Sequence, residues 1–419
     1  MKAKLMVVGN GEAATRFLES LLSIQAKGFE ITVVGKEPQP AYKRHLLTRI
    51  LQGEVAMEDA VFQDSDWYKS SGIRYYSNES VLTIDTDRSQ VKTDRGRKVR
   101  YDHLVIATGS SPYLLPIQGA GKKGVKTYRT LEDCRELIQT SETYKKAAVI
   151  GAGLLGLEVA MGLVHLGLET TVVHHQPNVM NRQLDRLASE MLQEALAANG
   201  LNFALSKRTR EITGDSHVKG IRFSDGSMME ADLVLMSVGI RPNVELAKKA
   251  GLEVHRGIVI DDDLCTSVPN VYAIGECAEH RDVLYGTIGP IYEQAEHLAR
   301  KLCDLPARYT GSMVSTHLNI RSINVFSTGQ VLETEETRTF QWIDPIRHIY
   351  KKVVTLHGHV IGAILYGDTS DALRLTQLVK EFAPVNEIPS NTLFPNVSRD
   401  RHNLKLVSKK FLSSGAGQP

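Results

Sequence analysis

Residues Ala147 to Val173 read AAVIGAGLLGLEVAMGLVHLGLETTVV. A short apolar run, Ala147 to Ile150, leads into three glycines with the spacing Gly-x-Gly-x-x-Gly, and a helix pattern follows. A second apolar run, Thr170 to Val173, closes the stretch. The order of strand, glycine turn, helix and strand is the context in which this glycine pattern binds a dinucleotide.

Each of the three glycines has a separate physical role in such a turn. Gly151 permits the tight bend, Gly153 lets a pyrophosphate approach the backbone, and Gly156 lets the helix lie close to the strand. The free N–H groups and the positive end of the helix dipole then face the phosphates. The alternative is a glycine-tolerant turn that holds no ligand, and a second copy of the pattern near residue 9 argues against it.

That second copy spans residues 4–37. An apolar run leads into Gly9-x-Gly11-x-x-Ala14, and Glu37 follows the next apolar run. An acid at this distance from the glycines suits a pair of ribose hydroxyls. The alternatives are that Glu37 is a solvated turn residue before a proline, or that its neighbour Lys36 takes the ligand. Two such folds predict one site for a flavin dinucleotide and one for a nicotinamide dinucleotide, so that a hydride can pass between them.

Composition narrows the class of protein. The chain has 419 residues, 42% hydrophobic and 23% charged, with a net charge of +2, which predicts two or three globular domains and argues against nucleic acid as a partner. No apolar run approaches the roughly 18 residues that span a bilayer. The first residues enter a strand without a secretory leader pattern, so we expect a cytoplasmic protein that does not insert into a membrane.

The cysteines, Cys134, Cys265, Cys277 and Cys303, form no close pair. A zinc site, an iron–sulfur cluster and a local redox disulfide are therefore not expected, and we predict no metal ligands.

Other stretches predict further elements. Strands are expected at residues 104–107, 231–238 and 270–277, and the proline-containing segment after Gly109 is expected to be a linker. Pro290 is expected to open a helix over 291–302. Beyond about residue 312 we expect strands at 320–326, 348–356 and 360–366, a helix at 371–381, and a loop-rich tail.

The order of these motifs resembles that of the FAD-dependent pyridine nucleotide-disulfide oxidoreductase superfamily. The motifs are the two glycine turns, Ala107-Thr-Gly109 and Tyr272-Ala-Ile-Gly-Glu276. The resemblance is closest to the rubredoxin and ferredoxin reductases and, within that group, to the flavoprotein part of NAD(P)H nitrite reductase large subunits. Tyr42-Lys-Arg44 and Arg182-Gln-Leu-Asp185 are among the features similar to that group.

The resemblance implies an α/β fold with two Rossmann-like three-layer domains and a C-terminal α+β interface domain. An FAD domain would comprise residues 1–115 and 242–310, and an NAD(P) domain residues 116–241. The interface domain would take residues 311–419, including the tail. It would shape either a homodimer or an acceptor surface, and the sequence leaves both open.

The resemblance also implies the FAD-binding residues. Gly9, Gly11 and Ala14 would hold the pyrophosphate and Glu37 the adenosine ribose, while Arg44 and Arg49 would meet the flavin. Arg49 stands where the family usually has a lysine near the isoalloxazine edge. Glu276 would bond a ribityl hydroxyl, or interact with a helix dipole, or do both. The remaining cofactor-binding positions implied are Ala107, Thr108, Gly109, Gly239, Gly275 and Pro290.

For the nicotinamide coenzyme, the resemblance implies Gly151, Gly153 and Gly156 at the pyrophosphate and Glu158 near the nicotinamide. The alternative for Glu158 is an ordinary exposed helix residue. His174 occupies the position that selects the ribose, where an acid would indicate NAD. We expect NADH and leave dual use with NADPH open. The residues implied to act in catalysis are Arg44, Arg49 and Glu158.

Residues 42–50 read YKRHLLTRI and lack the flavin-side cysteine of disulfide reductases and peroxidases. Chemistry by a cysteine nucleophile is therefore not expected, and we interpret Cys277 as structural. The predicted function is electron transfer from NAD(P)H through FAD to a rubredoxin- or ferredoxin-like carrier or to a nitrate or nitrite reductase component. The alternatives are a redox sensor of apoptosis-inducing-factor type and an NADH oxidase.

Overall fold

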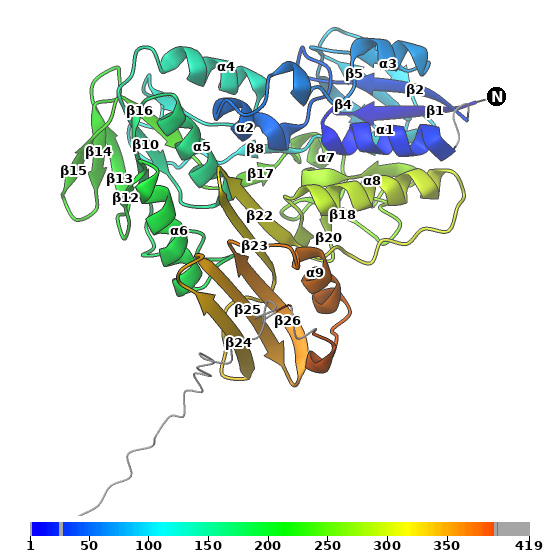
Figure 1. The fold of residues 1–419 in the computed structure, drawn as a ribbon. Coiled ribbons are helices and arrows are strands. Elements are labelled where there is room, and N and C mark those ends of the chain that lie inside the picture. Colours follow the sequence, from blue (N-terminus) through cyan, green and yellow to red (C-terminus); the bar gives the residue numbers. More distant parts are fainter. Residues whose placement is uncertain (1, 25–27, 389–391, 393–419) are drawn as a thin grey trace, which may run out of the picture.

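The computed structural model describes residues 2–24, 28–388 and Thr392. Figure 1 shows three sheet-centred parts, with the N-terminal part and the green central part side by side and the C-terminal sheet below them. The predicted fold class is confirmed, because two parallel sheets of Rossmann type are followed by an antiparallel sheet with a helix. The tail predicted after the last helix lies mostly outside the described residues.

The first parallel sheet has five strands, each paired in parallel with its neighbours. In sheet order they are β19 (Val271–Ala273), β7 (His103–Ile106), β1 (Ala3–Val8), β2 (Phe29–Val34) and β3 (Arg74–Tyr76). Helices α1 (Glu12–Ile24) and α8 (Ile288–Leu302) pack against each other, and Phe17 and Leu298 bury apolar side chains in the core of this part. A small antiparallel sheet of β4 (Val81–Asp85), β5 (Gln90–Thr93) and β6 (Lys98–Arg100) accompanies it.

The second parallel sheet repeats this arrangement. In sheet order its strands are β12 (Asn202–Ala204), β11 (Glu169–Val173), β10 (Lys146–Ile150), β16 (Leu233–Met236) and β9 (Val125–Lys126). The helices that accompany it are α4 (Leu131–Thr140), α5 (Leu154–His165) and α6 (Arg186–Ala198), and its small antiparallel sheet has β13 (Thr209–Thr213), β14 (Gly220–Phe223) and β15 (Met228–Glu230). The strands of both parallel sheets are mostly buried apolar runs, as expected when both faces of a sheet are covered.

The segment after Gly109 differs from its prediction. Instead of a linker without secondary structure, β8 (Ser110–Pro112) pairs antiparallel with β17 (Ile240–Pro242), so the chain leaves and returns to the first part along one ribbon. Pro112 is tolerated because this ribbon has only two strands and needs no second ladder. The predicted domain bounds near residues 115 and 242 remain a prediction.

Short elements connect these parts. They are α2 (Leu47–Leu51), α3 (Ser65–Ser70), α7 (Glu245–Lys249), β18 (Ile258–Ile260), β20 (Ala278–His280), β21 (Val283–Leu284) and the 3-10 turns at Arg44–Leu46, Glu58–Ala60, Gly275–Cys277 and Val385–Glu387. The strand predicted to run into a glycine and an acid within 270–277 is β19, and Gly275 then begins a 3-10 turn with φ +80°. Helix α8 begins at Ile288, two residues before Pro290.

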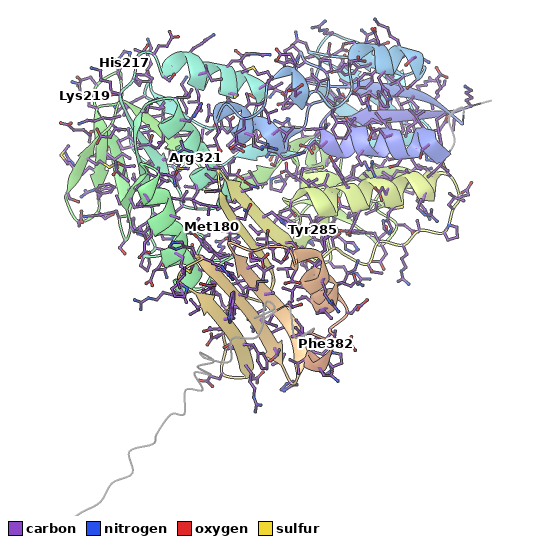
Figure 2. All side chains as sticks on the ribbon, in the orientation of Figure 1. Met180, His217, Lys219, Tyr285, Arg321 and Phe382 are labelled. Carbon is purple, nitrogen blue, oxygen red and sulfur yellow. The ribbon has the colours of Figure 1, made fainter. Side chains whose placement is uncertain are left out.

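The C-terminal sheet is antiparallel. In sheet order its strands are β22 (Ser315–Ile320), β23 (Ile323–Gly329), β26 (His359–Tyr366), β25 (Ile349–Leu356) and β24 (Thr337–Asp344), and α9 (Ala372–Lys380) packs on β23 and β26. The prediction of one strand at 320–326 is wrong, because the chain reverses at Arg321, where φ is +53°. Figure 2 labels Arg321 at this turn, from which its Nη1 donates to Asn199 Oδ1 over 2.9 Å.

Two consecutive lysines of β25, Lys351 and Lys352, are both buried. Each pairs with acids of other segments that pack against its own face of the strand. Lys351 Nζ lies 2.7 Å from Asp368, while Lys352 Nζ lies 2.9 Å from Asp185 and 3.1 Å from Glu333. Tyr350 also donates to Asp185, over 2.6 Å. Asp185 precedes α6, so this carboxylate joins the C-terminal sheet to the second part.

Replacing Asp185 by Asn should lower the free energy of unfolding by about 2 kcal/mol, because buried Lys352 loses one of its two acids. Asn keeps the N-cap bond that Asp185 accepts from Ala188 through Oδ1, so the loss reports on the contacts of Oδ2 with Lys352 and Tyr350. Urea denaturation measures it. The control is Glu190→Gln, which removes an exposed pair with Arg186 and should change stability by less than about 0.5 kcal/mol. Equal effects of the two variants would contradict this account.

Candidate active site between two dinucleotide folds

The first glycine turn is fixed by a close backbone contact. Gly9 has φ +108°, and a Cβ there would lie 2.1 Å from the carbonyl oxygen of Ala107 at the end of β7. By contrast, a Cβ on Gly11 would meet no atom within 4 Å, so the space beside it is open. Ala14 is fully buried in α1. Gly9 is therefore required by the close packing of the turn, whereas the space beside Gly11 is free for a ligand.

The second glycine turn has the same geometry. Gly151 has φ +117°, and a Cβ there would lie 2.1 Å from the carbonyl oxygen of Ser237 after β16. The Cβ position of Gly153 is open, whereas a Cβ on Gly156 would lie 2.1 Å from the carbonyl oxygen of Gly151. Helices α1 and α5 thus each begin beside a glycine whose Cβ position is open, Gly11 or Gly153. This is the geometry expected of a pyrophosphate site.

A chain of charged groups lies beside the first turn. Glu37 accepts hydrogen bonds from the Tyr42 hydroxyl, over 2.6 Å, and from Arg44 Nη2, over 2.8 Å. Arg44 Nη1 also donates to the carbonyl oxygen of Arg129, over 2.5 Å. The structure therefore brings together Glu37, predicted at the adenosine ribose, and Arg44, predicted at the flavin, and it adds Arg129, which sequence reasoning missed.

Arg129 is placed by the start of α4. Thr130 and Asp133 form a capping box there, and Asp133 also accepts from the backbone N–H of Arg129, over 2.8 Å. The guanidinium of Arg129 then forms an ion pair with Glu276, which also accepts from Ser110 Oγ over 2.9 Å. The partly buried carboxylate of Glu276 is thus bound by Ser110 of strand β8 and by Arg129, which precedes α4 of the second part. Its spacing from Arg129, 147 residues in sequence, gives no signal that sequence reasoning could use.

The loop after β7 is held by the returning chain. Thr108 Oγ1 donates to the carbonyl oxygen of Asn243, and Asn243 Nδ2 donates to the carbonyl oxygen of Thr108, both over 2.8 Å. Gly109 has φ +64°, and its Cβ position lies 3.8 Å from Glu276 Oε2. Gly239, with φ +114°, has an open Cβ position at the start of β17. These contacts group the predicted positions 107–109, 239 and 276 around one junction.

The start of α8 lies against this junction. Gly275 donates its backbone N–H to Gln294 Oε1 over 2.7 Å, and its Cβ position is only 2.9 Å from Ala13 Cβ in α1. Pro290 is buried in the first turn of α8, where a missing N–H is tolerated. Gly275 and Pro290, both predicted cofactor-binding positions, therefore take part in the packing of α8 against α1, and their contact with the cofactor stays a prediction.

Glu158 joins the two folds. It lies on α5 of the second part, and its Oε2 accepts from Thr48 Oγ1 of α2 over 3.3 Å. Gln52 Nε2, which follows α2, donates to the backbone carbonyl of Glu158 over 2.9 Å. Desolvation raises the pKa of the Glu158 carboxyl to about 7, although the Thr48 hydrogen bond and the nearby His45 act in the opposite direction. A carboxyl in this position changes its charge near neutral pH.

Arg49 does not join this group. Its Nε lies 3.0 Å from Glu54 Oε2, and 51% of its side chain is exposed. It is Thr48, the preceding residue, that reaches Glu158, because successive residues of the short helix α2 point in different directions. That Arg49 lies at the flavin edge stays a prediction.

A second cluster, missed by sequence reasoning, lies beside the open glycine of the first turn. Glu12 directly follows Gly11, and its nearly buried carboxylate lies 3.2 Å from His45 Nδ1 and accepts from the Tyr292 hydroxyl over 3.3 Å. The three residues come from α1, from the turn before α2 and from α8. The acid after the glycines is visible in the sequence, but its partners are long-range contacts that the sequence does not indicate.

Two comparisons with known families place the chain. Residues 3–298 match the family model described as pyridine nucleotide-disulphide oxidoreductase, and residues 315–383 match the rubredoxin NAD+ reductase C-terminal domain. The chain belongs to the pyridine nucleotide-disulphide oxidoreductase family. The predicted superfamily is confirmed.

Curated relatives refine this placement. The chain is similar to a nitrite reductase [NAD(P)H] of Bacillus subtilis, with 44% identity over 400 residues, covering 95% of the chain and 50% of that protein. It is 47% identical over 375 residues to an assimilatory nitrate reductase electron transfer subunit of the same organism, covering 89% of the chain and 49% of that protein. The chain therefore spans about half the length of these relatives.

A solved structure agrees with the fold. The ferredoxin reductase of Rhodopseudomonas palustris superposes with a TM-score of 0.82 and 26% identity, covering 89% of this chain and 93% of that one.

Within the described residues, none of the helices has the length and apolarity required to cross a membrane.

His174, the position predicted to select the coenzyme, carries no charge at neutral pH. His174 follows β11, and its Nε2 lies 3.3 Å from Asn181 Oδ1, while its ring lies 4.7 Å from that of His175. Burial lowers the pKa of the His174 imidazole, so this ring is uncharged at neutral pH. Arg182 is exposed nearby in sequence. The predicted preference for NADH stays a prediction.

The cysteines offer no reactive thiolate at this site. All four are free, and burial raises the pKa of the thiols of Cys134 and Cys277. Cys277 Sγ lies 3.3 Å from the carbonyl oxygen of Ile274, inside the core. A thiol held in its protonated form is a poor nucleophile, which agrees with the interpretation of Cys277 as structural.

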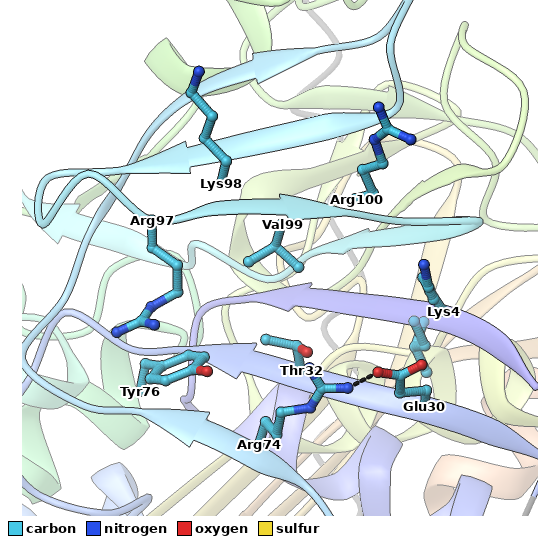
Figure 3. A pocket seen from close by; sticks show the side chains of 10 residues that line it. Lys4, Glu30, Thr32, Arg74, Tyr76, Arg97, Lys98, Val99 and Arg100 are labelled. Atoms are coloured by element: carbon cyan, nitrogen blue, oxygen red, sulfur yellow. Dashed lines mark ion pairs between the residues drawn. The ribbon is translucent and has the colours of Figure 1, made fainter.

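Two further features lie apart from the junction. A cavity of about 280 Å³ lies between β6 and the first parallel sheet, where Arg74 pairs with Glu30 (Figure 3). Because Lys4 and Glu30 lie near the amino ends of their strands, this cavity is at the opposite end of the sheet from the glycine turn. Elsewhere, His255, Glu279 and Asp282 approach one another, but the amide of Gly257 and the guanidinium of Arg256 already compensate Glu279.

The open glycines allow a paired test. Gly11→Ala and Gly153→Ala should both fold, because neither new methyl meets an atom within 4 Å. Gly153→Ala should keep its FAD and bind NADH at least about tenfold more weakly, a loss of about 1.4 kcal/mol, while Gly11→Ala should be purified with less FAD. Gly156→Ala is the contrasting variant, because its methyl would overlap a carbonyl oxygen and should lower stability. Unchanged NADH affinity of Gly153→Ala would contradict the assignment.

Glu158→Gln should stabilise the FAD-free protein more at pH 8 than at pH 5. Between the ordinary carboxyl pKa of about 4.3 and about 7, the folded chain keeps a proton that the unfolded chain has lost. The destabilisation caused by Glu158 therefore grows as pH rises through this window, so the gain from Gln should be about 2 kcal/mol larger at pH 8. Urea denaturation at both pH values measures this. The control Glu54→Gln, in an exposed pair with Arg49, should show no such dependence.

Proposed function

We propose that the chain is an NAD(P)H-dependent FAD oxidoreductase that passes electrons from a nicotinamide coenzyme to a separate acceptor. The acceptor would be a rubredoxin- or ferredoxin-like carrier or a component of a nitrate or nitrite reductase. The observation that carries the proposal is the contact of Glu158 with Thr48, which joins two dinucleotide folds whose second glycines, Gly11 and Gly153, are both open. This arrangement suits two nucleotides whose reactive rings meet between the folds.

FAD, when bound, would accept a hydride from the coenzyme and release electrons singly. The chain itself would bind and orient both nucleotides, because no acid–base residue is strictly needed for hydride transfer. In the proposed arrangement, Gly153 admits the coenzyme pyrophosphate and Glu158 lies near the nicotinamide. A carboxyl with a pKa of about 7 would bind the positively charged oxidised ring better when ionised.

On the flavin side, Arg44 and Arg129 are the cations available to the pyrophosphate, and Glu276 would accept from a ribityl hydroxyl. Arg129 and Glu276 already form an ion pair, so each is held in place before a ligand arrives. Glu37 is engaged by Arg44 and Tyr42, and it would accept ribose hydroxyls with its remaining lone pairs. We propose that Arg49, whose Nε lies 3.0 Å from Glu54 Oε2, meets the flavin edge.

The class of acceptor is supported by two observations. Residues 42–50 contain no cysteine, so a disulfide substrate would lack its usual nucleophile. A relative that covers 89% of the chain is named an electron transfer subunit. We further propose NADH as the preferred coenzyme, and a cytoplasmic location, which the four free cysteines support.

Anaerobic titration of the FAD-loaded protein with NADH, and separately with NADPH, tests the proposal. We expect bleaching of the flavin by one equivalent of coenzyme, with NADH effective at the lower concentration. Reduced protein should then reduce rubredoxin or ferredoxin faster than it reduces oxygen. No bleaching by either coenzyme would overturn the proposal. Bleaching followed by rapid reaction with oxygen alone would indicate an NADH oxidase, and bleaching without turnover but with a change in sedimentation would indicate a redox sensor.

A further inference from the structure

Strand β24 (Thr337–Asp344) is the edge of the C-terminal sheet. Among the described residues it pairs only with β25, so one side of its backbone has no ladder partner. Figure 1 places β24 at the outer margin of the lower sheet. A long edge strand with free N–H and C=O groups is a template for pairing with another strand, unless charges, prolines or bulges prevent it.

This edge lacks such protection at its centre. The strand reads TRTFQWID, with no proline, and its only charges are Arg338 and Asp344 near the two ends. Between them, Phe340 is 43% exposed and Ile343 is 48% exposed. In the turn that follows, Ile346 is 89% exposed. Apolar side chains are therefore exposed to solvent along the unpaired edge of β24. This combination favours the binding of a partner strand.

The pairing with β25 shows which side chains share a face. Phe340 lies opposite Val353 and Trp342 opposite Lys351, whose ammonium group points to Asp371 beside α9. Arg338, two residues before Phe340, lies on this same face. Helix α9 covers β23 and β26 but does not extend to β24 in the described contacts. The two aromatic rings and the charges at the ends thus form one row on an uncovered part of the sheet.

We propose that β24 pairs antiparallel with β24 of a second copy of this chain, with Gln341 on the two-fold axis. Residues equally distant from Gln341 then face each other. Arg338 of one copy lies opposite Asp344 of the other, and Phe340 lies opposite Trp342, each twice. The result is two ion pairs flanking four aromatic rings on one continuous sheet, and cross-strand pairs of both kinds are favourable.

Neighbouring registers are worse. Only alternate residues of an edge strand point their N–H and C=O groups toward the partner strand. A shift of the pairing by one residue would set such a residue opposite one whose groups point away, so only shifts by an even number of residues preserve the ladder. Centring the pair on Phe340 places Arg338 opposite Trp342, and centring it on Trp342 places Asp344 opposite Phe340. Both registers lose the two ion pairs, and the second also sets a carboxylate against an aromatic ring. The sequence of the strand thus selects one register.

Asp344 can accept this partner without giving up its own role. Its Oδ1 accepts from the backbone N–H groups of Ile346 and Arg347, both over 3.0 Å, and so fixes the turn after β24. Its Oδ2 lies 3.9 Å from Arg347, a weak contact that leaves room for a closer guanidinium. A single strand pair is smaller than the interfaces of permanent dimers, so we expect dissociation in the micromolar range.

Sedimentation of the full, FAD-loaded chain over a hundredfold range of concentration tests the proposal. We expect a reversible monomer–dimer equilibrium. Phe340→Lys and Arg338→Glu should each weaken it at least about tenfold, because they place a cation or a like charge across the axis. The matched control is Met228→Lys on β15, another exposed apolar strand residue, which should leave the dimer unchanged. Unchanged flavin content verifies that each variant is folded.

Cross-linking tests the register. A cysteine at position 341 would lie opposite the same position of the second copy. The two Cα atoms would be about 4.5–5.5 Å apart, a distance that a disulfide spans. Gln341→Cys should therefore form disulfide-linked dimers under mild oxidation. Thr339→Cys, on the same face, should not, because its two copies lie roughly 13 Å apart along the strands. The parent chain, with its four cysteines, gives the baseline. A monomer at every concentration, a dimer insensitive to Phe340→Lys, or equal cross-linking at 339 and 341 would overturn the proposal.

Discussion

The structure depends on a steric constraint that occurs twice: the first glycine of each turn lies against the carbonyl oxygen at the end of a neighbouring strand. At Gly9 and at Gly151 a Cβ would be 2.1 Å from that oxygen, and both residues have positive φ. Only glycine satisfies both conditions, and the tight turn that results begins each helix at the edge of its sheet. The second glycine, Gly11 or Gly153, is then exposed to a ligand and not to protein.

The site depends next on how the two folds are joined. The ribbon of β8 and β17 carries the chain between them, and the ion pair of Arg129 with Glu276 crosses beside it. On the other side, Thr48 contacts Glu158, whose raised pKa reflects desolvation between the two parts. Because these contacts link residues far apart in sequence, the relative position of the two nucleotide sites is set by tertiary packing and not by either glycine turn alone.

This division explains what could be predicted from the sequence. The glycine turns, the parallel strands and the helix after them were predictable, because local steric rules determine them. The contact of Thr48 with Glu158 was not predictable, since the direction in which a side chain leaves a short helix depends on what that helix packs against. The cluster of Glu12 with His45 was missed for a similar reason: a hydrogen bond between distant segments leaves no periodic pattern. The reversal within 320–326 was missed because that run is apolar on both sides of its turn.

The central proposal is that the nicotinamide lies against the flavin in one fixed orientation, beside the contact of Thr48 with Glu158. The most direct test uses NADH deuterated on one or the other face of the nicotinamide C4, with the oxidised coenzyme analysed by mass spectrometry after anaerobic reduction of the flavin. The account predicts complete loss of deuterium from one of the two coenzymes and complete retention in the other. Partial retention in both, or oxidation without flavin reduction, would contradict it.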